Sequence, residues 1–170
     1  MDTPRRPKTA TRATKPSQKD IFTTYGLPPS IKSKSQLRYT TPIERGILWY
    51  WFSLFIRTRD KDLPCINCGL PKEDRHAGHY IGTGQCGWDE LVFNEKNVNS
   101  ECSSCNQRDK AKLKYEYNLE KKYPGAPQEL KNLYHHYRLN GGRNWSRMAY
   151  IERINYYRGE VEKFSTPKYK

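Results

Sequence analysis

Hydrophobic residues are crowded into one stretch in the first half of the chain and recur at helical spacing in its last third. Residues 47–56 are apolar almost all the way round a helix, a pattern typical of a helix that is buried on more than one side. Thr41 is expected to cap this helix, Pro42 to occupy its first position and Glu44 to complete a capping box. The pattern therefore predicts a helix that ends at about Arg59.

Three further helices are predicted in the last third. Residues 107–123, 127–139 and 145–164 carry apolar side chains at helical spacing, and proline or glycine separates the three segments. The last segment has a narrow apolar seam that steps by four and three, as in a coiled coil, and consists of Tyr150, Ile154, Tyr157, Val161 and Phe164. We expect this seam to pack on the chain's own first helix, and a dimer interface is the alternative.

Short β elements are predicted between the first helix and these three. We interpret residues 77–82 as a first strand, the glycine-rich residues 82–87 as a loop and residues 91–93 as a returning second strand. Another helix is expected to begin near Cys105. The order strand, loop, strand, helix places the chain in the α+β class, with a small sheet surrounded by helices.

Two Cys-x-x-Cys pairs bracket this predicted sheet. Each pair places two sulfurs on one side of a tight turn, and two such turns supply the four thiolates of a structural zinc. We therefore predict that one zinc ion per chain is bound by Cys65, Cys68, Cys102 and Cys105. Disulfides are the alternative, but four of the five cysteines fall in these pairs, which is typical of metal binding in a reducing compartment.

A strong positive charge indicates a polyanionic partner. Lysine and arginine number 31 against 18 acidic residues, so the formal net charge is +13, and nucleic acid is the partner that such a field favours. Residues 1–38 are rich in Pro, Lys, Arg, Ser and Thr, and we interpret them as a disordered basic arm that contacts phosphate or only aids solubility. Because neither a signal peptide nor a membrane-spanning stretch is predicted, a cytoplasmic location is expected.

The histidines between the two cysteine pairs are the candidates for chemistry. A neutral His79 can take a proton from water and so generate a nucleophile for a phosphodiester, if an acceptor such as the amide of Asn97 holds its other nitrogen. Asn106 and His76 are candidate ligands for a catalytic Mg²⁺ or Mn²⁺. On a regular strand the two histidines would point to opposite faces, but a bulge at Gly78 would return them to one face.

Several short motifs occur together in an order that resembles one family. They are Phe52-x-x-x-Ile56-Arg57-x-Arg59-Asp60, Cys65-Ile66-x-Cys68-Gly69, Ala77-Gly78-His79-Tyr80, Asn97-Val98 and Cys102-x-x-Cys105-Asn106. Over roughly residues 48–164 the chain resembles the NinG/Rap family of lambdoid phages, and more broadly the zinc-clipped HNH (His-Me finger) nucleases. The junction-resolving endonuclease of T-even phages has a similar layout, with a metal-binding Asn directly after its last zinc-binding Cys.

The resemblance implies a ββα-metal core and a structure-specific DNA endonuclease that acts on recombination intermediates such as Holliday junctions and D-loops. Carried over by motif position, His79 is the base with Asn97 in support, Asn106 binds the catalytic metal, and the four paired cysteines bind zinc. Branched DNA is the expected partner, and recombination proteins of phage or host are further expected partners. A homodimer is also considered.

One position departs from the pattern of HNH enzymes. These enzymes usually carry Asp or His directly before the base, whereas this chain has Gly78 there. The first ligand of the catalytic metal must therefore come from elsewhere. His76 is the first candidate, and Asp74 and Asp89 follow it.

The predicted elements divide the chain into four regions. These are the basic arm 1–38, the aromatic-rich helix region 39–62, the nuclease core 63–122 and a helical region 123–170. The side chains expected to contact DNA phosphates are Arg57, Arg59, Arg108, Lys110 and Lys112. The rival interpretation is a zinc-stabilised DNA-binding module without catalysis, which explains the charge and the cysteines but gives the histidines no shared role. A phage structural protein explains still less.

Overall fold

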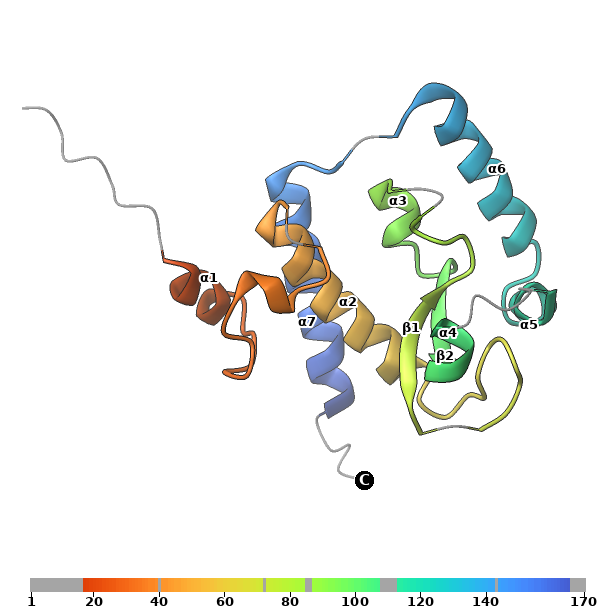
Figure 1. Cartoon of the computed structure of the whole chain (residues 1–170), viewed down its shortest axis with the longest axis horizontal. Coiled ribbons are helices and arrows are strands. Elements are labelled where there is room, and N and C mark those ends of the chain that lie inside the picture. Colours follow the sequence, from red (N-terminus) through yellow and green to blue (C-terminus); the bar gives the residue numbers. More distant parts are fainter. Residues whose placement is uncertain are drawn as a thin grey trace, which may run out of the picture.

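Two helices that lie far apart in the sequence pack side by side at the centre of the fold (Figure 1). They are α2, Ile43–Arg59, and α7, Arg147–Ser165, in a computed structural model that describes residues 17–39, 41–71, 73–84, 87–107, 113–142 and 144–165. The predicted packing of the last helix on the first is confirmed, because the seam residues Tyr150, Ile154, Tyr157 and Val161 are buried in a core shared with α2. Phe164, the last predicted member of the seam, is 48% exposed.

The beginning of α2 differs from the prediction, although its end at Arg59 is confirmed. Pro42 rather than Thr41 is the N-cap residue, and no side chain caps the helix. Glu44 is buried and accepts a hydrogen bond from Arg147 Nε at 2.7 Å. The carboxylate therefore ties α2 to the first turn of α7 instead of completing a capping box.

Residues 17–38 are folded, which corrects the prediction of a disordered arm for this part of the chain. They contain α1, Gln18–Thr24, which Ser17 caps, and a short 3-10 helix, Lys34–Gln36 (Figure 1). Three apolar side chains of this segment are buried in the core around α2: Phe22, Leu27 and Leu37. The average composition of this segment is polar. A few apolar side chains are nevertheless enough to fold it against the protein, because the broad aromatic surface of α2 lets each of them bury apolar area. Residues 1–16 lie outside the described residues.

The sheet consists of two antiparallel strands (Figure 1). β1, Arg75–His79, confirms a strand that carries His79, but it begins and ends earlier than the predicted residues 77–82. β2 is Val98–Cys102. The predicted second strand at residues 91–93 is wrong, because these residues belong to α3, Asp89–Val92, and to the turn that follows it. Two acidic residues in the first turn of α3 favour a helix, and a three-residue apolar run is too short to distinguish a helical turn from a strand.

The pairing of β1 with β2 is unbroken. Arg75 lies opposite Cys102, His76 opposite Glu101 and His79 opposite Val98, with no residue left over. The predicted bulge at position 78 is therefore wrong. In a regular strand side chains alternate, so the two histidines of β1 leave it on opposite faces.

The remaining helices follow the prediction closely. α4, Ser103–Gln107, begins where β2 ends, and α6, Ala126–Asn140, confirms the helix predicted at 127–139. α5 is Leu113–Lys122, and residues 108–112, where its beginning was predicted, lie outside the described residues. A second core joins α3, α5 and α6 and includes Leu91, Tyr115, Leu119, Ala126 and Leu130.

The four predicted regions are therefore connected by packing. Region 39–62 shares its core with α7 from region 123–170, while α6 from the same region packs with segment 63–122. Among the described helices, none combines the length and the apolar character that crossing a membrane requires.

Candidate functional site

The two cysteine pairs come together at one end of the sheet. The four sulfurs of Cys65, Cys68, Cys102 and Cys105 lie within 4.8 Å of one another, and none of these cysteines is in a disulfide. A tetrahedral zinc with Zn–S bonds of about 2.3 Å holds its sulfurs about 3.8 Å apart, so a small contraction would close the shell. The donor set and its geometry fit a structural zinc, as predicted.

Backbone hydrogen bonds shape the first cysteine turn. Gly69 adopts φ +73°, a conformation that glycine adopts without steric cost, and its N–H donates to the Cys65 carbonyl at 2.8 Å. The N–H of Cys102 donates to Cys65 Sγ at 3.3 Å, which links the two turns. Burial alone would raise the pKa of the Cys102 thiol, but hydrogen bonds from Ser104 and from the backbone of Cys105 outweigh burial and lower that pKa to about 7. A thiolate is the form that binds metal.

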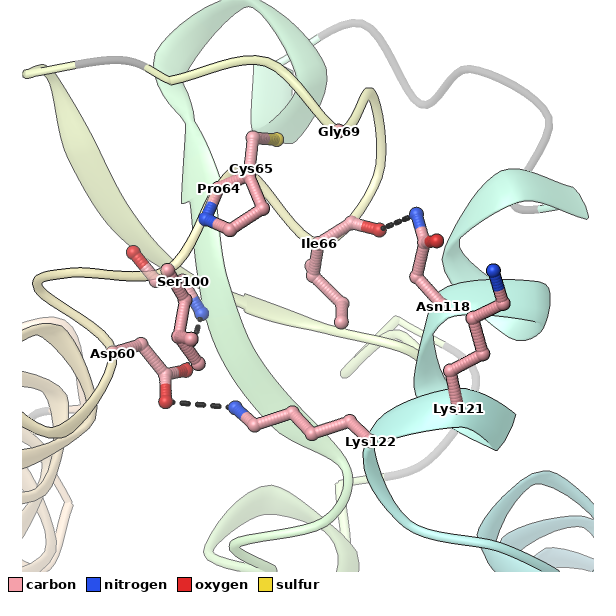
Figure 2. Close-up of a pocket in the computed structure, with 10 residues that line it drawn as sticks. Asp60, Pro64, Cys65, Ile66, Gly69, Ser100, Asn118, Lys121 and Lys122 are labelled. Atoms are coloured by element: carbon pink, nitrogen blue, oxygen red, sulfur yellow. Dashed lines mark hydrogen bonds and ion pairs between the residues drawn. The ribbon is translucent and has the colours of Figure 1, made fainter.

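The first cysteine turn is attached to α5 across a cavity of about 310 Å³ (Figure 2). Asn118 Nδ2 on α5 donates to the Ile66 carbonyl at 2.8 Å. On the other side of the cavity, Lys122 Nζ lies 2.7 Å from Asp60 Oδ1 (Figure 2). The cysteine turn is therefore held both by its sulfurs and by polar contacts with α5.

Asp60 is the centre of a buried charge cluster that joins α2, β2 and α5. Its carboxylate accepts hydrogen bonds from Arg59 Nε at 2.8 Å, from Lys122 Nζ at 2.7 Å and from the Ser100 N–H at 3.0 Å. Arg59 also donates to the carbonyls of Glu95 and Val98, so its guanidinium is engaged inside the protein. Burial would raise the pKa of Asp60, but the two cations outweigh it and lower that pKa. The predicted phosphate contact of Arg59 stays a prediction, and it would compete with these internal contacts.

We expect Asp60→Asn to lower the free energy of unfolding by about 3–5 kcal/mol, because it leaves two cations buried without a counter-charge. Urea unfolding at neutral pH measures the effect. The contribution of Asp60 is present above its unfolded pKa of about 3.9 and is lost as the pH falls through the lower folded pKa. Glu129→Gln is the control, since it breaks an exposed pair with Lys96 and should cost less than about 1 kcal/mol. Equal effects of the two substitutions would contradict this role of Asp60.

His79 is buried on the α2 side of the sheet. Its ring is stacked on Trp49, with centroids 5.1 Å apart and an angle of 12°, and the residue is only 6% exposed. Its Nε2 lies 3.0 Å from the carbonyl oxygen of Val92. A carbonyl can only accept, so Nε2 carries a hydrogen. In the neutral form of the ring, which a general base requires, Nδ1 is the nitrogen that would take up the proton.

Asn97 has a different task from the one predicted. The acceptor beside His79 is Val92, whereas the Asn97 side chain bridges the loop between the strands. Its Nδ2 donates to the carbonyls of Leu91 at 2.8 Å and Ile81 at 3.2 Å, and its Oδ1 accepts from the Ile81 N–H at 2.8 Å. Asn97 therefore supports His79 indirectly, because it fixes the loop that carries the Val92 carbonyl.

His76 and Asn106 are brought together at the edge of the sheet. His76 Nδ1 lies 3.3 Å from Asn106 Nδ2, and a half-turn of the amide would present its oxygen instead. Both side chains line a cavity of about 160 Å³ whose other walls are Arg38, Trp49, Ser53, Arg57 and Ala77. Burial lowers the pKa of Arg57, and no described carboxylate pairs with it. His79 does not line this cavity, although its stacking partner Trp49 does.

The two alternative metal ligands are occupied by other contacts. Asp74 accepts hydrogen bonds from the N–H and the hydroxyl of Ser103 at the start of α4. Asp89 is fully buried and accepts from Arg45 at 2.7 Å and from the Trp145 N–H at 2.8 Å. Of the three predicted candidates for the first ligand, only His76 faces the cavity that contains Asn106.

Comparison with known proteins identifies the family. A family model described as "Bacteriophage Lambda NinG protein" matches residues 46–166. The chain belongs to the NinG family. It is 47% identical over 60 residues to Protein ninG of Escherichia phage lambda, and 45% identical over 60 residues to Protein ninG of Escherichia phage 933W and of Salmonella phage P22. These matches cover 35% of this chain and only 28–29% of the relatives' length. No solved structure matches the chain.

Within this member of the NinG family, the glycine before His79 has a steric reason. A Cβ at position 78 would lie 1.8 Å from Oε2 of Glu101, whose fully buried carboxylate lies across the strand at this point. Asn67 Nδ2 donates to the other oxygen of that carboxylate at 3.2 Å. A buried carboxylate from β2 therefore fills the space beside the position before His79. The sequence Val98–Cys102 has no alternation of apolar and polar residues, so no pattern in it predicted this strand.

The contribution of Arg38 to the cavity was also absent from the prediction, because the surrounding segment was interpreted as disordered. Its neighbours Leu37 and Tyr39 were the signal, since apolar residues on both sides of a cation indicate a docked segment. The three predicted phosphate contacts Arg108, Lys110 and Lys112 lie outside the described residues.

Proposed function

We propose that this NinG family member is an endonuclease that depends on a divalent metal and cuts branched DNA of the kind formed in recombination. The observation that carries the proposal is the pairing of His76 with Asn106 in a polar cavity that also contains Arg57. The cavity lies beside a hairpin that a zinc site braces, and the hairpin carries His79. A zinc-stabilised binding module without catalysis remains the rival, and it would give these four side chains no common task.

In the proposed reaction, His79 acts as the general base. Its Nδ1 takes a proton from a water molecule, and the water oxygen attacks the phosphorus as the bond to the 3′ oxygen breaks. The products are a 5′-phosphate and a 3′-hydroxyl, and the leaving 3′ oxygen takes up a proton. The bond from Nε2 to the Val92 carbonyl stabilises the imidazolium that forms and holds the ring in the productive tautomer.

His76 and Asn106 would hold the catalytic metal. An imidazole nitrogen and an amide oxygen fit a divalent ion that keeps several of its water ligands, and imidazole suits Mn²⁺ somewhat better than Mg²⁺. When bound, such an ion withdraws charge from a phosphate oxygen and from the leaving oxygen. Glu101 is the nearest fully buried carboxylate on the same strand pair, since it lies directly opposite His76.

Selection among DNA shapes would rest on charge and form. Contacts with backbone phosphates carry no base information, so an enzyme that relies on them distinguishes substrates by the path of the strands. The net charge of +13 supports contacts of this kind. Branched DNA presents strand paths that no linear duplex offers.

A cleavage assay tests the proposal. Purified protein is incubated with a Holliday junction, a D-loop, a three-way junction and a linear duplex of matched sequence, with Mg²⁺, with Mn²⁺ or with chelator. We expect nicks in the branched substrates that require the metal and leave ends that DNA ligase can seal. Tight binding of every branched substrate without any cleavage would favour the binding module and would end the endonuclease proposal.

His76→Ala is expected to fold, to keep its zinc and to bind DNA, but to need about tenfold more Mg²⁺ for cleavage, the order of effect of losing one ligand contact. Asn106→Ala should behave alike, and Mn²⁺ should rescue both variants better than Mg²⁺. His136→Ala, which removes an exposed imidazole from α6, is the control. Should His76→Ala be silent while Glu101→Gln raises the Mg²⁺ requirement, the buried carboxylate would be the ligand.

A further inference from the structure

Arg38 extends into the candidate site from a segment outside the family match. Its guanidinium carbon lies 4.9 Å from the centre of the Trp49 ring and 5.6 Å from that of Tyr39, within the range of cation–π attraction. The segment that carries it, residues 17–39, precedes the matched residues 46–166. Arg38 nonetheless lines the same cavity as His76 and Asn106.

The backbone around Arg38 is anchored on both sides. Leu37 is only 5% exposed and packs in the core beside α2. Tyr39 meets Trp49 edge to face, with ring centroids 5.5 Å apart. A long flexible side chain loses less freedom on binding when its backbone and its guanidinium are both held in advance. Arg38 is therefore presented to the cavity in a prepared position.

The lining of the cavity selects an anion. Arg38 and Arg57 bring two guanidinium groups from two different segments, and no described carboxylate lines the space between them. The Ser53 hydroxyl donates to the Tyr50 carbonyl at 3.1 Å, so the two arginines are the charged donors that the lining offers to a ligand. A phosphate group offers only acceptors, which matches this set of donors.

The size of the cavity indicates which anion is bound. About 160 Å³ corresponds to roughly five water molecules at about 30 Å³ each. That space suits one phosphate group with a few waters, and because the cavity is open, the rest of a longer ligand would lie outside it. The ligand would therefore be a single phosphodiester of a strand that continues beyond the cavity on both sides, which fits a nucleic acid better than a free nucleotide.

We infer that Arg38 and Arg57 form a clamp for one phosphodiester group, placed against His76 and Asn106. This inference rests on the proposed endonuclease function, because the clamp would hold the phosphate that is cut. It assigns a binding role to the segment before the matched family region: that segment completes the site. Two guanidinium groups would also stabilise the negative charge that develops on the phosphate oxygens during attack.

The clamp can be tested without any cleavage. The probe is the dinucleotide thymidylyl-(3′→5′)-thymidine, which has a single phosphodiester, titrated into isotope-labelled full-length protein without added Mg²⁺ or Mn²⁺. We expect NMR signals of the Trp49 indole and the His76 ring to shift, and Arg38→Gln to weaken binding about tenfold, the usual cost of one charge-assisted hydrogen bond. Arg57→Gln should act alike, and Arg38→Lys should recover part of the loss.

Arg138→Gln is the matched control, because it removes the same charge from an exposed site on α6 and should leave the titration unchanged. Thermal melting checks that each variant is folded. Signals that do not shift in the wild-type protein would overturn the clamp, and so would an Arg38→Gln variant that binds as tightly as wild type. If the dinucleotide binds as expected but no branched DNA is cut with any metal, the clamp stands and the endonuclease proposal fails.

Discussion

Replacing Cys102 with serine is expected to release the zinc and to unfold the β1–β2 hairpin together with α4. Metal binding to a structural zinc site contributes directly to folding, with apparent free energies of about 10–16 kcal/mol in small zinc-dependent peptides. Cys102 is the last residue of β2, and its N–H also donates to Cys65 Sγ. The loss of Cys102 would therefore destabilise both the strand that carries His79 and the helix that carries Asn106.

Elemental analysis and circular dichroism measure the two parts of this result. The wild-type protein should contain one zinc per chain, whereas Cys102→Ser should contain little and should show a broad, low-temperature transition. Cys86→Ser is the control, because Cys86 lies outside both cysteine pairs. Freshly purified wild-type protein that is folded and free of zinc would overturn the four-thiolate site.

His79→Gln is expected to lower the cleavage rate by two to four orders of magnitude, roughly the contribution of a general base. Glutamine is chosen because its terminal NH₂ can reach the Val92 carbonyl that now accepts from His79 Nε2, so the buried acceptor keeps a partner. The substitution removes the basic nitrogen without opening a large cavity beside Trp49. Single-turnover cleavage of a branched substrate measures the loss, and equilibrium binding of the same substrate should be unchanged.

His79→Ala provides the comparison that separates chemistry from packing. If His79 is the base, the alanine and glutamine variants should lose similar activity, while only alanine lowers the melting temperature strongly, since it leaves a cavity under the indole. A glutamine variant that cleaves within a few-fold of wild type would show that His79 serves packing alone. His76, which lines the cavity, would then be the histidine of the site that contacts water.

The helices were the most predictable part of the fold. α2, α6 and α7 are recognisable in the sequence because one face of each is buried over several turns. The resulting repeat of 3.6 residues remains detectable even where single positions depart from it. The run at 91–93 was too short for periodicity to decide, and tertiary packing made it a helical turn. The segment around Phe22 was hidden for the opposite reason, because averaging over many basic and polar residues concealed a few side chains that the core requires.

The candidate site was predictable where chemistry imposes spacing. The four cysteines followed from residue type and spacing, since a structural zinc constrains both. His76 does lie beside Asn106, although the bulge from which this was predicted is absent. The internal contacts of Arg59 were not predicted, because the sequence does not reveal that Asp60 is buried beside it. The bulge at Gly78 was inferred from local backbone freedom alone, whereas the reason for the glycine is a carboxylate from the other strand. The environments of Arg59 and Gly78 are set by contacts between segments that are distant in the sequence, which local patterns do not reveal.

The pairing of α2 with α7 bears on the order of assembly during synthesis. α2 leaves the ribosome early, whereas α7 is made only after every intervening strand and helix. In the folded protein the rings of Phe52 and Phe55 contact that of Tyr157, with centroids 5.0 and 5.1 Å apart. These two side chains therefore have no partner on α7 until synthesis is nearly finished. Contacts of such long sequence separation form slowly, because the chain must first be closed. We therefore expect the zinc-clamped hairpin to form first and the aromatic helix to stay uncovered for longest, which would make α2 the segment that chaperones bind in the nascent protein.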